Sequence, residues 1–173
     1  MLGRYDEFPA DASCFAQFVY LGSIHRLQTA IARPMHRLNQ QPINLATITA
    51  ASPPNCYVNF EFGIADTDAF YYLDQKQLSA VERALKAQSL PILDVFCASR
   101  YKIKKEKGGD KPLQFDYSVL RFTFENQDVE LLLHYVRGIQ RIPRKDFILF
   151  LRDQIDKELV EKKHKTLALK SLF

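Results

Sequence analysis

The chain has 173 residues, of which 47% are hydrophobic and 25% charged, a composition that indicates a globular protein and excludes a disordered or fibrous one. A chain of this length buries roughly 70% of its unfolded surface, so it needs no disulfide or metal to fold. Its net charge of +4 at pH 7 permits an anionic partner, although strong nucleic-acid binders are usually more basic or concentrate their charge.

The chain is expected to begin with a strand and a helix. Residues 14–21 are apolar and aromatic, which favours a strand, with a helix as the alternative. Apolar residues then recur at helical spacing over about 24–33, with Ser23 as a suitable N-cap. Pro34 is expected to end or kink that helix.

Three strands and a helix are expected next. Residues 43–49, 56–62 and 69–73 read as strands, and the alternation of apolar and polar residues is cleanest in the second of them. A helix over about 75–88 has the clearest local signals, because Asp74 is a good N-cap and an apolar stripe follows it.

The order of three strands and a helix then repeats. Residues 92–103, 114–125 and 129–136 predict a meander of long strands, with a tight polar hairpin turn between the first two. An apolar stripe follows Pro143, which suits the first position of a helix. The tail, residues 165–173, is too apolar to be simply disordered, and either extends this helix or docks separately.

These elements predict an α+β fold of order β-α-βββ-α-βββ-α, with one or more mostly antiparallel sheets and helices packed on one side. We expect one domain over residues 1–173. Its alternative description is two pseudo-equivalent halves, about 43–90 and 91–164, with a strand-helix lead-in before them and the apolar tail after them. The halves share element order only.

The cysteines and the lengths of the apolar runs bear on the cellular location of the protein. Cys14, Cys56 and Cys97 are odd in number, far apart and set in apolar runs, so we expect buried free thiols rather than disulfides or a zinc site. This pattern suits a reducing compartment, which predicts a cytoplasmic protein. No apolar run has the length of a signal peptide core or a membrane span.

No catalytic or cofactor motif stands out. The sequence contains no P-loop, no G-x-G-x-x-G and no G-x-S-x-G pattern, and its histidines lack metal-ligand spacing. Asp66 and Asp68 form a D-x-D that suits a turn better than a metal site. We therefore expect no metal and no cofactor, and we favour a binding protein over an enzyme. An enzyme would need a dispersed site from residues such as Glu61, Asp66, Asp68 and His134.

The most distinctive feature is a set of basic residues in two groups. Arg100, Lys102 and Lys104 share one face of a strand at a spacing of about 6.6 Å, close to the phosphate repeat of an extended single strand. Tyr101 and Tyr117 lie near them in the sequence and are candidates for stacking on bases. The other members are Lys105, Lys107 and Lys111 in the hairpin, and Arg137, Arg141, Arg144 and Lys145 before the last helix.

The leading functional prediction is a non-catalytic binding module that contacts RNA, DNA or another polyanion through the basic hairpin. It requires the two basic groups to gather on one surface. Lysines that merely keep a sheet edge from aggregating are the competing explanation. The alternatives are the dispersed-site enzyme and a protein-interaction subunit or homo-oligomer that uses the apolar tail residues Leu167, Leu169, Leu172 and Phe173.

Overall fold

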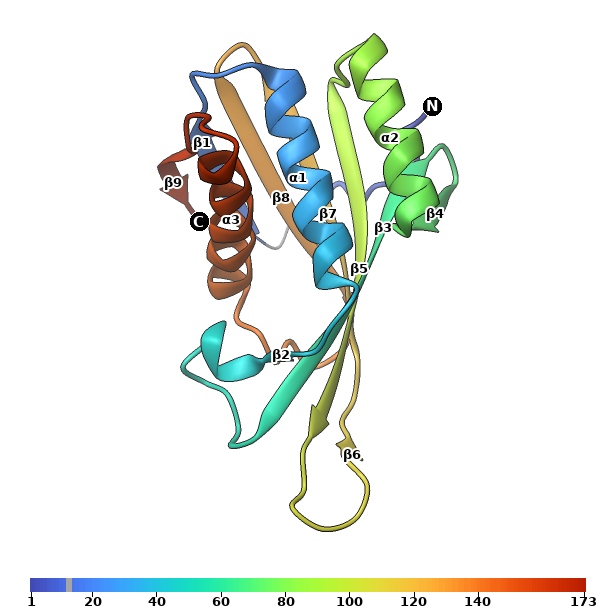
Figure 1. Ribbon diagram of the computed structural model, residues 1–173, viewed down its shortest axis with the longest axis vertical. Coiled ribbons are helices and arrows are strands. Elements are labelled where there is room, and N and C mark those ends of the chain that lie inside the picture. The colour runs from blue at the N-terminus through green and yellow to red at the C-terminus, as the bar shows by residue number, and fades with distance from the viewer. Residues whose placement is uncertain (12–13) are drawn as a thin grey trace.

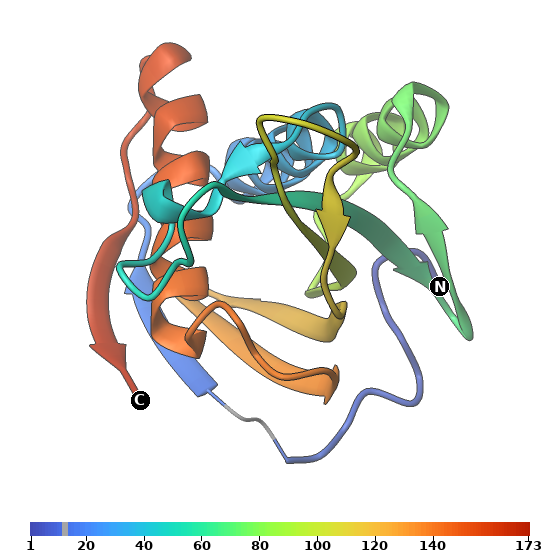
Figure 2. The same ribbon diagram turned by 90° about the horizontal axis from the view of Figure 1, so that it is seen from below.

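The fold is a single antiparallel sheet with three helices on one of its faces (Figure 1), as the computed structural model describes it for residues 1–11 and 14–173. The strand order is β2-β3-β5-β7-β8-β1-β9, with β4 paired to β3 and β6 paired to β5. Viewed from below, the sheet curves around the helices (Figure 2). The predicted α+β class and antiparallel pairing are confirmed, and the element order agrees in outline.

The strands are β1 (Cys14–Val19), β2 (Ile43–Asn44), β3 (Cys56–Asp66), β4 (Ala69–Tyr72), β5 (Ile92–Ile103), β6 (Lys111–Pro112), β7 (Asp116–Glu125), β8 (Asp128–Arg137) and β9 (Ala168–Leu172). The helices are α1 (Ile24–Leu38), α2 (Gln75–Ala87) and α3 (Arg144–Glu161), with a 3₁₀ turn at Leu45–Thr47. In the described part of the chain, no helix is both long and apolar enough to cross a membrane.

The core lies between the sheet and the helices. Alternate residues of each strand face the helices, as a period of two requires, and they form the core. Phe60 of β3, for example, stacks on Phe147 of α3 with ring centroids 5.8 Å apart. The other face of the sheet therefore carries the remaining half of the strand side chains. On this face, Asp94, Ala98 and Val119 are buried as well.

Two predicted bounds were wrong: the end of the first helix and the end of the strand that follows it. Helix α1 continues past Pro34 to Leu38, because Pro34 lies on the buried side, where packing offsets the backbone hydrogen bond that proline cannot make. The strand expected over 43–49 stops after Asn44, whose side chain accepts a hydrogen bond from the Ala46 amide at 3.1 Å and starts the 3₁₀ turn.

The apolar tail docks separately and does not extend α3. It forms β9, which pairs antiparallel with β1 at the sheet edge. The backbones of Phe15 and Phe173 exchange two hydrogen bonds, at 3.0 and 2.8 Å. Leu167 is buried, whereas Leu169 and Phe173 remain exposed.

An N-terminal segment covers part of the sheet face that lies opposite the helices. Its backbone bonds to both β3 and β5 near Gly3, whose φ of +87° and close approach to the Ile92 carbonyl exclude a side chain. Asp94, which is fully buried, accepts from the Tyr5 amide at 2.7 Å and pairs with Arg121 at 2.6 Å. This buried ion pair anchors the segment to the sheet.

Candidate nucleic-acid interface

Both basic groups lie at one end of the sheet. The hairpin that carries the first group follows β5, and the second group begins where β8 ends and continues into the start of α3 (Figure 1). Because β5, β7 and β8 are neighbours in the sheet, the start of β7 and the end of β8 lie at the same end of the sheet as the last residues of β5, which continue past β7 into the hairpin. Sequence alone could not supply that strand order.

A buried carboxylate joins the two groups. Asp116, only 2% exposed, accepts hydrogen bonds from the Tyr101 hydroxyl at 2.8 Å and from the backbone amides of Gln140 and Arg141 at 2.9 and 2.8 Å. The loop passes so close to Asp116 that a side chain at Gly138 would collide with its carboxylate. The loop that carries Arg141 is therefore fixed against the base of the hairpin.

Asp116 was missed in the sequence because a single aspartate at the start of a strand carries no motif. Tyr101, which was expected near the stacking surface, is 2% exposed and lies on the helix side of the sheet, so it cannot meet a base. Burial, and then the charge of Asp116, raises the pKa of Tyr101 far above its ordinary value. The hydroxyl thus stays protonated and donates to Asp116.

Two members of the first group are paired with carboxylates. Arg100 forms an ion pair with Glu61 of β3 at 2.9 Å, and Lys102 lies 3.6 Å from Asp110 across the hairpin. Both pairs are partly solvated, so their interaction energy is small and an incoming phosphate can compete for the cation.

The other lysines of the hairpin are more accessible to a phosphate than Arg100 and Lys102. Lys104 is exposed and lies over the ring of Tyr57, 4.1 Å from its centroid. Lys105, Lys107 and Lys111 are exposed as well. Among the residues that the structure describes, no ion pair joins any of these four lysines to a carboxylate.

The second group surrounds the loop before α3. Arg137 is exposed and lines a cavity of about 270 Å³ together with Phe115 and Tyr117. Arg141 lies over the ring of Tyr101, at 5.8 Å from its centroid. Arg144 and Lys145 line a second cavity, of about 570 Å³, at the N-terminus of α3, where no side chain caps the helix. The positive end of the helix dipole adds to the local field there.

A row of aromatic rings runs across the sheet face that lies opposite the helices. The centroids of Phe70 and Phe96 are 5.6 Å apart, and those of Phe96 and Tyr117 are 5.8 Å apart. Phe115 extends the row beside Tyr117, with the guanidinium of Arg100 at 4.9 Å from its ring centroid. Of these rings, sequence reasoning identified only Tyr117. The alternation within β5 could also have placed Phe96 on this face of the sheet.

The residues of the dispersed enzyme site do not gather. Glu61 is on β3 and His134 on β8, with β5 and β7 between them. Asp66 is at the end of β3 rather than in a turn, and pairs with the N-terminal amine at 3.1 Å. The described residues contain no group of three or more histidine, cysteine, aspartate or glutamate side chains placed to hold a metal.

Comparison with known proteins adds no assignment: no protein family, no curated protein and no solved structure matches this chain. The functional argument therefore depends on the site alone.

Proposed function

We propose that the protein is a non-catalytic module that binds single-stranded nucleic acid at the basic end of its sheet. We call this end of the molecule the basic end. It is defined by the ten residues Arg100, Lys102, Lys104, Lys105, Lys107, Lys111, Arg137, Arg141, Arg144 and Lys145. The cations would neutralise phosphates, and this contact would read little sequence.

The observation that carries the proposal is the Asp116 contact. It ties the Arg141 loop to the base of the hairpin, so that cations from two segments far apart in the sequence belong to one end of the molecule. Edge protection explains lysines on an exposed hairpin. It does not explain why an arginine-rich loop before α3 is held beside them by a buried carboxylate.

The aromatic rings favour a single strand over a duplex. Tyr117 and Phe115 are half-buried, line a cavity with Arg137 and lie beside the cations of the hairpin. Unpaired bases stack on such rings at about 1–3 kcal/mol per base, whereas a duplex keeps its bases stacked inside. A single strand would therefore gain both phosphate and base contacts.

The direct test is fluorescence anisotropy of a labelled single-stranded oligouridine across a salt series. The affinity should fall with salt with a logarithmic slope of about −0.7 for each phosphate contact. The double variant Lys105→Ala/Lys107→Ala should weaken binding and reduce the slope by about 1.4, since it removes two such contacts.

A matched control is the variant Lys76→Ala/Lys86→Ala, which removes two exposed lysines from α2, away from the hairpin. It should leave the slope unchanged. Failure of the wild-type protein to bind the oligonucleotide at low ionic strength would end the proposal. An equal loss in both double variants would mean that net charge, and not this surface, causes the binding.

A further inference from the structure

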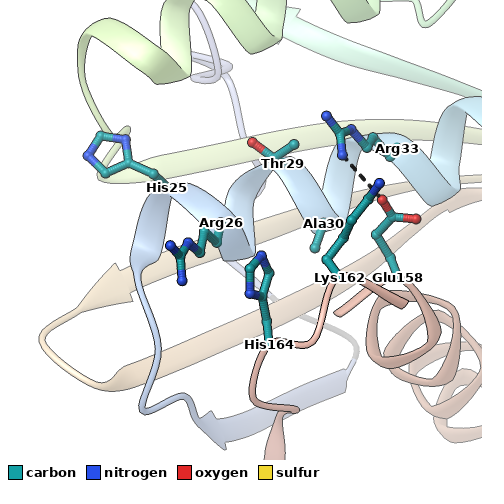
Figure 3. A pocket seen from close by; sticks show the side chains of 8 residues that line it. All are labelled: His25, Arg26, Thr29, Ala30, Arg33, Glu158, Lys162 and His164. Atoms are coloured by element: carbon teal, nitrogen blue, oxygen red, sulfur yellow. Dashed lines mark ion pairs between the residues drawn. The ribbon is translucent and has the colours of Figure 1, made fainter. Parts of the chain in front are cut away.

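A second cationic site lies at the other end of the helices, between α1 and α3 (Figure 3). It is a cavity of about 240 Å³ whose charged lining includes Arg26 and Arg33 of α1, Glu158 of α3, and Lys162 and His164 just after α3. The side chain of Arg26 lies beside that of His164, and Lys162 lies beside Arg33 (Figure 3). None of these cations belongs to the basic end.

The cavity has an excess of positive charge. Its lining has three permanent cations, Arg26, Arg33 and Lys162, against one carboxylate. That carboxylate, Glu158, is 3% exposed and is occupied by Arg33 at 3.5 Å and by Arg37 at 2.7 Å. Arg33 also pairs with Glu82 of α2 at 2.7 Å, so two carboxylates hold it at the wall, whereas in the described residues no ion pair neutralises Arg26 or Lys162.

Helix electrostatics explains only part of this arrangement. Lys162 and His164 follow the C-terminus of α3, where the helix dipole favours cations. Arg26 is in the first turn of α1, which contains no acidic residue, and a cation there opposes the dipole. Arg26 therefore lowers the stability of the helix locally, which is typical of a residue that binds a ligand.

We propose that this cavity binds the phosphate group of a small phosphomonoester or free inorganic phosphate. Arg26 offers a planar donor fork that matches phosphate oxygens, and Lys162 adds a second charge. Arg33, which Glu82 and Glu158 hold in place, can contribute only its remaining donors. The volume is below the range of about 300–1,000 Å³ for drug-sized ligands, so a phosphate with at most a small organic part suits it. This site is independent of the nucleic-acid proposal, because it shares no residue with the basic end.

The test is isothermal titration calorimetry of the full chain with inorganic phosphate, at an ionic strength held constant with chloride. We expect saturable binding with a Kd of about 1 mM or tighter. The variant Arg26→Ala should weaken it about tenfold, the effect of one lost charge-assisted hydrogen bond. Arg26 is exposed, so its removal should leave the fold intact, which circular dichroism can verify.

Arg83→Ala is the matched control, because it removes an exposed arginine from α2 that does not line the cavity. It should bind phosphate like the wild type. Glucose 6-phosphate distinguishes the sources: tighter binding than phosphate identifies an ester ligand, and equal or weaker binding identifies the free ion. Absence of saturation at about ten times the expected Kd, or an equal loss in both variants, would overturn the proposal.

Discussion

Asp116 is the residue whose replacement should affect both the fold and the basic end. Its carboxylate accepts three hydrogen bonds, of 2.8, 2.8 and 2.9 Å, in a position that is 2% exposed. In Asp116→Asn only one oxygen remains, so at least one donor loses its acceptor and faces an NH₂ group instead. Losing one charge-assisted bond costs about 1.5–3 kcal/mol, and the surviving bonds weaken without the charge.

We therefore expect Asp116→Asn to lower the free energy of unfolding by about 3 kcal/mol, which is about 6–12 °C in Tm for a chain of this size. Urea denaturation followed by circular dichroism measures the free energy, and a thermal scan checks it. The control is Asp110→Asn, whose exposed carboxylate only pairs with Lys102 and should change stability by less than about 0.5 kcal/mol. A similarly small effect of Asp116→Asn would refute the reasoning.

Four further predictions concern the rest of the fold. Burial raises the pKa of the Cys14, Cys56 and Cys97 thiols, so a chromogenic thiol reagent at about pH 8 should label them only after denaturation. The same raised thiol pKa values favour the protonated folded state, so urea denaturation should show stability falling as the pH rises above about 8.5. Removing residues 167–173 exposes the edge of β1 and should lower Tm and promote self-association, measurable by sedimentation velocity. Arg121→Ala leaves the buried Asp94 without its cation and should cost about 3–5 kcal/mol, with faster hydrogen exchange near Tyr5.

Elements with local signals were predictable from the sequence. Helix α2 begins after Asp74, whose side chain accepts from the Gln77 amide at 2.7 Å, as its N-cap position indicated. Strand β5 has the predicted bounds, and the turn after it is polar and exposed. In both cases the signals that predict the element lie among neighbouring residues.

Features that depend on distant partners were not predictable. The tail becomes a strand only because β1 offers a free edge, and Pro34 stays helical only because the core surrounds it. The basic end needed both the strand order and Asp116, whose three partners lie 15 to 25 residues away in the sequence. No pattern within a short window contains that information.

Variants at Asp116 and in the hairpin can separate two contributions to nucleic-acid binding, the charge of the cations and their placement. A single affinity measurement combines the two. Hairpin lysines such as Lys105 act through charge, so removing them should reduce both the affinity and its salt slope. Asp116→Asn removes no cation; it releases the Arg141 loop from Tyr101 and leaves the same charges less well placed. We therefore expect weaker oligouridine binding with a salt slope like that of the wild type, measured below the melting temperature of the variant. A salt slope reduced as in the lysine variant would contradict this expectation. It would mean that fewer cations contact phosphates in Asp116→Asn, rather than the same number in a poorer arrangement.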